Sequence, residues 1–399
     1  MSTLSGRIEG NAIIGQSGGP TAVINQSLVG CVEGLRKSTA VKKIYGARHA
    51  VAGMVTADFV DLTDMPQERL DRLAVTPSSA LGSSRDKPDA AYCRKILATF
   101  QAHNIRYFFY IGGNDSSDTC RIVNDLAKVE GYELRTFHIP QTIDNDLMCN
   151  DHTPGFGSAA RFVVQAMMGD NLDNKALPGV KINVVMGRHA GFLTAASMLA
   201  RQQDGDGPHL IYVPEAVFDI DSFLADVDRV RTKYGRCLIA VSEGIHDAEG
   251  QPIAAKLAES VEKDSHGNVQ LSGTGALGDF LANLVKTRLG VKRVRADTFG
   301  YLQRSMAGVF SPVDAAEARE AGRKAAEVAI MGNFDGSIAI NRVSNAPYQV
   351  EYNMVALEDV AAKTRHLPQE YIVAGNDIHE SFRDYLAPLV GELPVVEQL

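Results

Sequence analysis

Short apolar runs alternate with amphipathic segments along the chain. This alternation predicts repeated strand–helix units, and therefore a mostly parallel sheet with helices on both faces. Each of the runs that resemble buried strands stops at glycine or at a polar residue: NAIIGQSGGP, IRYFFYIGGND, RTFHIPQTIDND, KINVVMGRHAG, HLIYVPE and CLIAVSEGI. Ligands of parallel sheets bind beyond the carboxyl ends of the strands, so these endings together predict a ligand crevice.

A second pattern predicts a helix over residues 311–332, SPVDAAEAREAGRKAAEVAIMG. Ser311 is expected as its N-cap, Pro312 as its first residue and Asp314 as the acid of a capping box, with Gly332 ending it. We expect this helix to be structural.

Composition narrows the class of protein. With 399 residues, 45% of them apolar and 22% charged, the chain is expected to form two globular domains. A net charge of −8 argues against a nucleic-acid partner. The five cysteines form no CxxC pair, which predicts reduced thiols in a cytoplasmic protein. We found no signal-peptide pattern and no apolar stretch of about 20 residues, so no membrane association is expected.

Two double glycines suggest an anion site. Gly18-Gly19 and Gly112-Gly113 follow strand-like runs, and they leave room for a ligand to approach the backbone. Consecutive N–H groups in such turns bind anions, helped by a following helix N-terminus. The P-loop pattern is missing, and so is a clean dinucleotide-binding glycine motif after the first strand.

Basic residues complement these turns. Arg85 and Lys87 lie in a loop of small residues, and Arg188 follows a strand. A later segment, VKRVRADTFGYLQRS, adds Arg295 and Arg304. The arginine fork binds two phosphate oxygens at once. Most single arginines are solvated surface residues, but Arg188 and Arg304 sit among glycines and apolar residues, which favours a binding role.

The stretch QTIDND places two carboxylates, Asp144 and Asp146, beside the hydroxyl of Thr142. Two nearby carboxylates share either a proton or a cation, and Mg²⁺ uses one or two carboxylates together with substrate phosphates. The other carboxylate would accept the proton of an attacking hydroxyl. The stretch therefore suits phosphoryl transfer, although an Asp/Asn-rich turn without chemistry would read the same way.

Eight motifs together resemble the phosphofructokinase family, and its pyrophosphate-dependent branch more than its ATP-dependent branch. In order, they are SGGPTAVIN, GSSRDK, GGNDS, TIDND, MGRHAG, VPE, SEG and GYLQR, within residues 15 to 305. The resemblance implies an α/β fold of two Rossmann-like domains with mostly parallel sheets, helices on both faces and the active site in the cleft between them. It also implies Mg²⁺-dependent transfer from pyrophosphate to the 1-hydroxyl of fructose 6-phosphate.

The resemblance also implies a role for each matching residue. Asp144 would be the general base, Thr142 would bind the transferring phosphoryl group and Arg188 would stabilise its charge. Asp115 and Asp146 would be the metal-associated carboxylates. Donor-binding residues would be Gly18, Gly19, Arg85, Gly113, Asn114, Asp115, Ser116 and Gln141. Sugar-phosphate-binding residues would be Thr142, Asp144, Met186, Gly187, Arg188, Glu243, Arg295, Tyr301 and Arg304. Part of that pocket comes from a neighbouring subunit in this family, which implies a homodimer or a homotetramer.

The donor side departs from both branches. Asp115 and Thr119 replace glycines of ATP-dependent members, which favours pyrophosphate. Asn114 replaces an aspartate, however, and Gln141 replaces the lysine of pyrophosphate users. Two alternatives therefore stay open. One is the same fold using ATP or another sugar or sugar-phosphate acceptor, and the other is a catalytically weak regulatory subunit that binds sugar phosphate.

We expect residues 1–155 to bind the donor, joined by about 275–330. Residues 156–274 are expected to bind the sugar phosphate, joined by part of 331–365. Residues 366–399 are expected to form a C-terminal helical extension, to which the sequence assigns no chemistry.

Overall fold

The computed structural model describes residues 8–257 and 275–397. This part of the chain folds into two compact units. Unit 1 takes its described residues from Met1–Ile143, Leu147–Phe156 and Pro312–Thr364. Unit 2 takes its described residues from Asp144–Asp146, Gly157–Ser311 and Arg365–Leu399.

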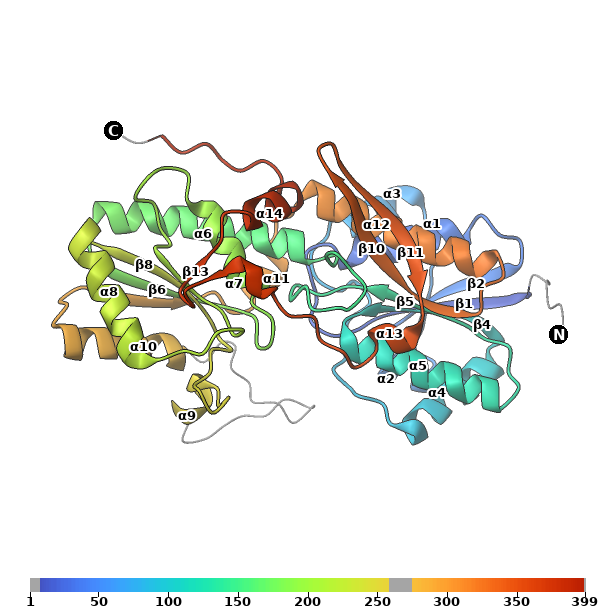
Figure 1. Ribbon diagram of the computed structural model, residues 1–399. Helices are drawn as coiled ribbons and strands as arrows, with labels where there is room; N and C mark the ends of the chain where they lie inside the picture. Colours follow the sequence, from blue (N-terminus) through green and yellow to red (C-terminus); the bar gives the residue numbers. More distant parts are fainter. Residues whose placement is uncertain (1–7, 258–274, 398–399) are drawn as a thin grey trace. The chain divides into compact units, whose positions relative to one another are not determined.

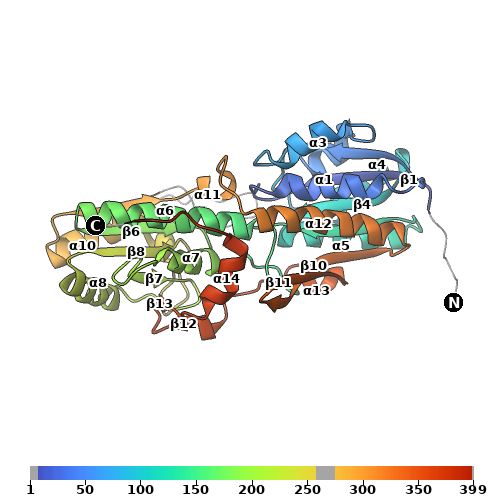
Figure 2. The same cartoon turned by 90° about the horizontal axis from the view of Figure 1, so that it is seen from above.

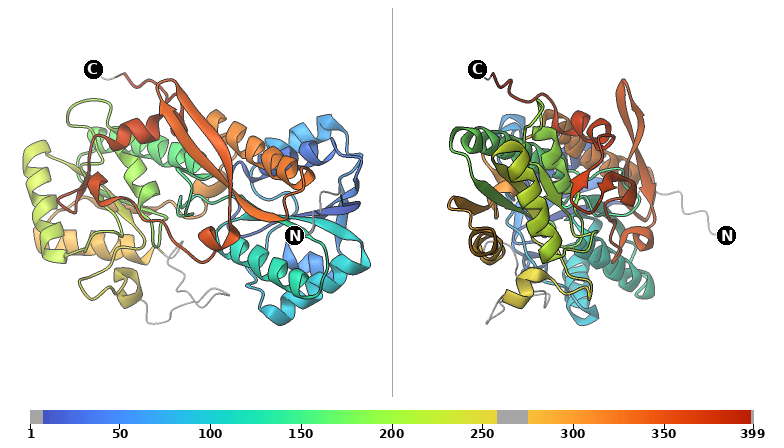
Figure 3. Two further views of the ribbon diagram at one scale, coloured as in Figure 1. Left: turned by 45° about the vertical axis from the view of Figure 1, so that its right-hand side comes forward. Right: turned by 60° about the vertical axis from the view of Figure 1, so that its left-hand side comes forward.

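Unit 1 is built on a seven-stranded sheet in the order β11-β10-β5-β4-β1-β2-β3 (Figure 1). The inner strands are parallel, while β11 and β3 each pair antiparallel at an edge. The strands are β1 (Gly10–Gln16), β2 (Val41–Ala47), β3 (Phe59–Asp61), β4 (Ile105–Gly112), β5 (Arg135–Pro140), β10 (Asp335–Asn345) and β11 (Tyr348–Val355). The helices are α1 (Ile24–Leu35), α2 (Val51–Thr56), α3 (Gln67–Ala74), α4 (Ala90–Ala102), α5 (Asn114–Val129), α12 (Pro312–Ile330) and α13 (Leu357–Val360). Figure 3 shows β10 and β11 as a long two-stranded ribbon.

Alternate residues of the inner strands enter two different cores. In β1, Ala12 and Ile14 pack in a cluster with α1, α3 and α12. Ile13, between them, packs in a cluster with α2, α4 and α5. Figure 1 shows these two sets of helices on opposite sides of the sheet. Because both faces are covered, the strands are apolar on both sides, and this is why they read as continuous apolar runs.

Unit 2 contains a four-stranded parallel sheet in the order β7-β8-β6-β9. In β6, Ile182 and Val184 face a core shared with α8 and α10, while Asn183 faces α6 and donates a hydrogen bond to Asp170 there. The strands are β6 (Val180–Val185), β7 (Leu210–Tyr212), β8 (Cys237–Ser242) and β9 (Val294–Thr298). The helices are α6 (Phe156–Ala176), whose first residue belongs to unit 1, α7 (Phe192–Ala196), η1 (Ser197–Ala200), α8 (Ile220–Tyr234), α9 (Ile253–Leu257), α10 (Ala276–Leu289) and α11 (Leu302–Ser305).

The last part of unit 2 begins at Arg365 and packs beside α6 and α7, as Figure 2 shows for α14. An aromatic cluster holds it in place: the ring centroids of Tyr385 and Phe192 are 6.4 Å apart, and those of Tyr371 and Phe382 are 5.0 Å apart. Its elements are η2 (Gln369–Tyr371), β12 (Ile372–Val373), β13 (Asp377–Ile378) and α14 (Phe382–Val390).

The α/β class, the mostly parallel sheets and the predicted strands are confirmed. The helix predicted after Ser311 spans Pro312–Ile330. The division into units differs from the expected one. Described residues from 275 to 311 belong to unit 2, because β9 pairs with β6, and residues 331–364 belong to unit 1, because β10 pairs with β5. Among the described helices, none combines the length and the apolar character that crossing a membrane requires.

Candidate active site

In unit 1, the carboxyl ends of three adjacent strands carry most of the predicted donor-binding residues. β1, β4 and β5 are neighbours, so their final residues lie along one edge of the sheet. The Ser116 hydroxyl, after β4, donates a 2.9 Å hydrogen bond to the Ser17 hydroxyl, after β1. The backbone N–H of Gln141, after β5, donates a 2.9 Å bond to the Gly112 carbonyl. Three stretches that are distant in sequence therefore form one edge.

The loop that carries Arg85 joins this edge. The backbone N–H of Gly18 donates to the Ser84 carbonyl at 3.1 Å, and the Ser83 hydroxyl donates to the Gly18 carbonyl at 2.6 Å. These bonds hold the loop against the Gly18-Gly19 turn. Arg85 follows Ser84 directly and is half-buried there. The structure thus brings together the double glycine and the arginine that the sequence had placed at one anion site.

Helix α5 begins at the same edge, with Gly113 as its N-cap residue and Asn114 as its first residue. Its N-terminal N–H groups and its dipole favour negative charge. Asp115 lies in the first turn, where its carboxylate pairs with the Lys87 ammonium at 3.2 Å. Lys87 therefore offsets the charge of Asp115, which as a free carboxylate would repel a phosphate group.

Thr142 is held by its backbone. Its N–H donates to the Pro154 carbonyl at 3.0 Å, and its carbonyl accepts a 2.9 Å hydrogen bond from the Thr153 hydroxyl. Gln141 beside it is 2% exposed. The Gln141 amide N–H donates to the Thr21 hydroxyl oxygen, while its amide oxygen is buried and has no hydrogen-bond partner among the described residues.

His138, which the sequence analysis did not single out, supports this edge from within the core. One ring nitrogen lies 2.8 Å from the Gly112 carbonyl and the other lies 2.8 Å from the Ser337 hydroxyl. Burial lowers the pKa of His138 to about 4, although hydrogen bonds to the backbone of Gly112 and Gly113 oppose the shift. The ring is therefore neutral near pH 7, so it donates one hydrogen bond and accepts the other. A lone histidine within an apolar strand gave no signal of this role.

In unit 2, the ends of β6 and β8 approach each other closely. The backbone N–H of Glu243 donates to the Val185 carbonyl at 2.9 Å. A Cβ atom on Gly244 would lie 2.0 Å from the Arg188 carbonyl oxygen, so only glycine permits this approach. Gly187 has φ +137°, a conformation that side chains disfavour. The MGR and SEG motifs thus form one surface, with Glu243 buried in it.

Gln303 connects the MGR motif to the GYLQR motif. Its side-chain oxygen accepts a 3.2 Å hydrogen bond from the Met186 N–H, and its amide donates to the Gly300 carbonyl at 2.8 Å. In the same motif, the Arg304 guanidinium lies 4.7 Å from the centre of the Tyr301 ring. The structure therefore brings together Met186, Tyr301 and Arg304. Gln303 lies within the GYLQR motif, but the motif alone gives no indication of this link.

The Asp144–Asp146 turn also belongs to unit 2. Asn145 lies between the two aspartates in the left-handed conformation, with φ +59°, and both carboxylates are half-buried. Burial and the Arg188 cation lower the pKa of His189, and the Asp144 carboxylate opposes that shift.

Arg295 lies apart from these residues. It is the second residue of the edge strand β9, it is exposed, and it pairs in register with Lys181 near the start of β6. The Met186–Arg188 turn follows the opposite end of β6. Lys181 itself forms ion pairs with Asp170 at 2.5 Å and with Asp297 at 3.2 Å.

The described residues contain no group of three or more His, Cys, Asp or Glu side chains that could hold a metal ion. The two predicted metal-associated carboxylates lie in different units, Asp115 in unit 1 and Asp146 in unit 2. A cage made of protein ligands alone is therefore not present in the described part. One or two carboxylates completed by substrate phosphates, as Mg²⁺ commonly uses, remain compatible with these residues.

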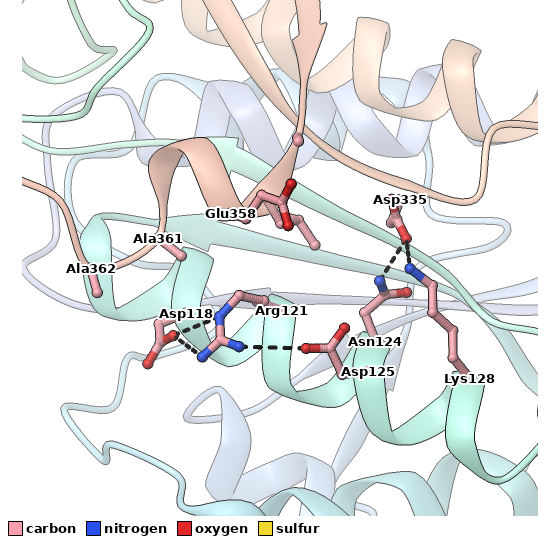
Figure 4. A pocket seen from close by; sticks show the side chains of 11 residues that line it. Asp118, Arg121, Asn124, Asp125, Lys128, Asp335, Glu358, Ala361 and Ala362 are labelled. Atoms are coloured by element: carbon pink, nitrogen blue, oxygen red, sulfur yellow. Dashed lines mark hydrogen bonds and ion pairs between the residues drawn. The ribbon is translucent and has the colours of Figure 1, made fainter.

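A separate pocket of about 540 Å³ lies in unit 1 between α5 and α13 (Figure 4). Arg121 pairs there with Asp118 at 2.9 Å, and Lys128 pairs with Asp335 at 2.6 Å. None of the predicted site residues lines this pocket. Since its cations are already neutralised by neighbouring carboxylates, we assign it no ligand.

Comparisons with known proteins identify the family of the chain. The sequence model of the phosphofructokinase family matches residues 11–329. The chain is 58% identical to the pyrophosphate–fructose 6-phosphate 1-phosphotransferase of Rhodospirillum rubrum over 96% of this chain and 95% of that protein. It is 31% identical to the sulfofructose kinase of Alkalicoccus urumqiensis over 96% and 97%.

Among solved structures, the pyrophosphate-dependent phosphofructokinase of Nitrosospira multiformis superposes with a TM-score of 0.86 at 35% identity. The match covers 98% of this chain and 94% of that one. Together with the family match over residues 11–329, these likenesses show that the chain belongs to the phosphofructokinase family.

Proposed function

We propose that this protein reversibly transfers a phosphoryl group from pyrophosphate to the 1-hydroxyl of fructose 6-phosphate, giving fructose 1,6-bisphosphate and phosphate. One observation carries the proposal: the adjacent residues Arg365 and His366 hydrogen-bond to the carbonyls of Asp146 and His189, each at 2.8 Å, so the turn with Asp144 and the loop with Arg188 are neighbours in one unit. A carboxylate beside an arginine is what phosphoryl transfer to an alcohol requires, because the reaction needs a proton acceptor and a stabiliser of phosphoryl charge. The 58% identity to a protein of that name supports the choice of substrates.

In the proposed reaction, the Asp144 carboxylate accepts the proton of the 1-hydroxyl. The freed oxygen forms a bond to the terminal phosphorus of pyrophosphate, and the bond from that phosphorus to the bridging oxygen breaks. Inorganic phosphate leaves with the bridging oxygen. Arg188 and Thr142 stabilise negative charge on the transferring group by donating hydrogen bonds.

The remaining predicted residues bind the substrates. The N–H groups near Gly18, Gly19 and Gly113, together with Arg85, Asn114, Ser116 and Gln141, would hold pyrophosphate. Met186, Gly187 and Glu243 would contact the sugar, and Arg304 and Tyr301 would hold the 6-phosphate. Asp146, with Asp115 as the second candidate, would hold Mg²⁺, which offsets phosphate charge when it is bound. Asp115 is the weaker candidate because Lys87 already pairs with it.

We also propose a homo-oligomer in which Arg295 serves the sugar-phosphate site of a neighbouring copy. Arg295 is exposed on the edge strand β9 and pairs in register with Lys181, at the end of β6 opposite to the Met186 turn. The segment around Arg304 exposes apolar side chains that a partner would cover: Leu302 is 65% exposed, Met306 43% and Phe310 37%.

The first test measures which substrates are used. Rates with pyrophosphate and with ATP are compared for fructose 6-phosphate and for sulfofructose, because one relative is named a sulfofructose kinase. We expect pyrophosphate with fructose 6-phosphate to give the highest kcat/KM. A higher kcat/KM with ATP or with the sulfonated sugar would overturn the proposed donor or acceptor. Binding of fructose 6-phosphate without turnover of any pair would instead support a regulatory subunit.

The second test removes the proposed base. We expect Asp144→Ala and Asp144→Asn to lower kcat by at least about 100-fold while fructose 6-phosphate binding, measured by calorimetry, survives. Asp204→Ala, which removes an exposed carboxylate elsewhere in unit 2, is the control and should leave kcat unchanged. If Asp144→Asn retains most of its kcat, Asp144 is not the base.

A further inference from the structure

We propose that the C-terminal part of unit 2 positions the Asp144–Asp146 turn for catalysis, and that Tyr385 is the main positioning residue. This inference rests on the proposed function, in which Asp144 accepts a proton. The C-terminal extension, for which the sequence indicates no chemistry, would then have a positioning role. Tyr385 would act through Asn145 and would not itself touch a substrate.

The hydroxyl of Tyr385 contacts the centre of the turn. The Asn145 side-chain amide donates a 2.8 Å hydrogen bond to the Tyr385 hydroxyl oxygen, and Asn145 is fully buried. Asn145 has φ +59°, a conformation that costs free energy for a residue with a side chain. A side-chain hydrogen bond offsets that cost and selects one orientation of the turn. The directions of the flanking Asp144 and Asp146 side chains depend on that orientation.

Tyr385 is itself held rigidly. It lies in α14, is 9% exposed and packs among aromatic rings. Its ring centroid is 5.4 Å from that of Phe382 and 6.4 Å from those of Phe192 and Tyr371. A buried aromatic side chain with few free rotations is a suitable anchor for a strained turn.

A backbone hydrogen bond supports the next residue of the turn. The N–H of Arg365 donates to the Asp146 carbonyl at 2.8 Å. The Arg365 guanidinium also lies 4.6 Å from the centre of the Phe192 ring, which belongs to the same aromatic group as Tyr385. The C-terminal part of unit 2 therefore holds two consecutive residues of the turn, Asn145 and Asp146.

The same segment also supports the loop that carries Arg188. A ring nitrogen of His366 lies 2.8 Å from the His189 carbonyl, so its N–H donates to that oxygen. The N–H of Leu367 and the N–H of Gly191 both donate to one carboxylate oxygen of Glu215, each at 2.8 Å. Residues 365–367 thus connect the Asp144–Asp146 turn to the Arg188 loop. Both proposed catalytic side chains take their positions from one support.

This shared support matters because proton transfer and charge stabilisation depend steeply on distance. A misplacement of about 1 Å can cost about 100-fold in rate without any loss of binding contacts. Sugar-phosphate binding should depend less on this support, because the Met186 and Arg304 motifs are linked directly through Gln303.

The experiment compares Tyr385→Phe with the wild-type protein. We expect kcat to fall about 10-fold, whereas KM and the calorimetric Kd for fructose 6-phosphate stay within about two-fold. His366→Ala, at an exposed position that should tolerate substitution, should also lower kcat without changing that Kd. The control is Tyr212→Phe, which removes a 3.1 Å hydroxyl bond to Asp226 in the same unit. It should lower Tm and leave kcat unchanged.

Three outcomes decide the inference. A fall in kcat for Tyr385→Phe and His366→Ala, but not for Tyr212→Phe, supports it. A change in Tm alone, as in the control, would show that Tyr385 is structural and would overturn it. If the wild-type protein turns over no substrate pair, the proposed function fails, and the inference that rests on it fails with it. Equal kcat values for an active wild type and for Tyr385→Phe overturn the inference alone.

Discussion

At the residue scale, Gln141 departs from the family pattern and is also unusual in its hydrogen bonding. Its side chain is buried, yet its amide oxygen has no hydrogen-bond partner in the described part of the chain. A buried polar atom without a partner costs about 1–3 kcal/mol. If the amide rotates, its oxygen accepts a hydrogen bond from the Thr21 hydroxyl and its N–H can donate to an anionic ligand, but the amide carries no charge. A lysine at this position would add a positive charge when the anion is bound.

At this position we expect Gln141→Lys to raise kcat/KM for pyrophosphate several-fold, because a charged donor makes roughly twice as strong a hydrogen bond to phosphate as a neutral one. Pyrophosphate should also raise the Tm of this variant more than that of the wild type, because the anion relieves the buried ammonium charge. Gln101→Lys adds the same charge at an exposed position of unit 1 and should change neither quantity. An unchanged or lower kcat/KM would show that the site has reorganised around the amide.

At the scale of elements, an ionic network joins the loop after β5 to α12 and to the β10–β11 hairpin. His152 is 2% exposed, and its ring nitrogens lie 2.7 Å from Asp151 and 2.6 Å from Glu317. Arg342 of β10 pairs with Asp151 at 3.1 Å, and the Tyr348 hydroxyl of β11 donates to Glu317 at 2.6 Å. The loop continues to Thr153, whose hydroxyl holds the Thr142 carbonyl. The network therefore anchors the backbone of a proposed catalytic residue.

This network should make the stability of the protein depend on pH. Burial opposes the charge on His152, but hydrogen bonds to Asp151 and Glu317 outweigh it and raise the pKa of His152 to about 9, from an ordinary value of 6.5. Because the folded pKa lies above the unfolded one, the stabilisation is complete below pH 6.5 and is lost as the pH rises through about 9. The change should amount to a few kcal/mol.

The measurement is urea unfolding at about pH 6 and at about pH 10 for wild type and His152→Gln. We expect the variant to be much less stable than the wild type at the lower pH and closer to it at the higher pH. His103→Gln, at an exposed histidine of unit 1, should follow the wild type. A difference between wild type and His152→Gln that is equal at both pH values would show that the imidazole charge contributes nothing.

At the scale of the whole molecule, we proposed that Arg295 completes the sugar-phosphate site of a neighbouring copy. This can be tested by mixing two variants of the chain. We expect Arg295→Ala and Arg304→Ala each to lose most of the activity. If Arg295 serves the neighbouring copy, each site uses Arg304 of its own chain and Arg295 of the other chain. A dimer of the two variants then contains one site with both arginines and one site with neither. Random assembly of equal amounts would then restore roughly a quarter of the wild-type sites.

The two variants should be co-expressed, and molar mass should be measured by light scattering to verify assembly. Substitution of the exposed Leu302 by Glu is expected to lower that molar mass, while Val343→Glu, at an exposed apolar position of unit 1, should not. No recovery of activity in assembled mixtures would place Arg295 in the site of its own chain or outside any site.

The sequence by itself determined the α/β class, the strands, and the clustering of glycines and charged residues at the strand ends. These features depend on residues that are adjacent in sequence. A strand covered on both faces requires a continuous apolar run, and the turn at its end requires glycine or polar residues. The eight ordered motifs also identified the family before any contact was known.

Only the tertiary structure decided which distant residues support these motifs. The chain passes to the other unit after Ile143, Asp146, Phe156, Ser311 and Thr364, so the TIDND motif itself is divided between the units. The local sequence does not indicate the supporting roles of His138, His152, Gln303 and Tyr385. Each acts through a hydrogen bond to a residue that is remote in sequence or to a motif to which it does not belong. Strand pairing and side-chain packing arise from contacts between segments far apart in the chain, and a periodic pattern within one segment does not specify its partner.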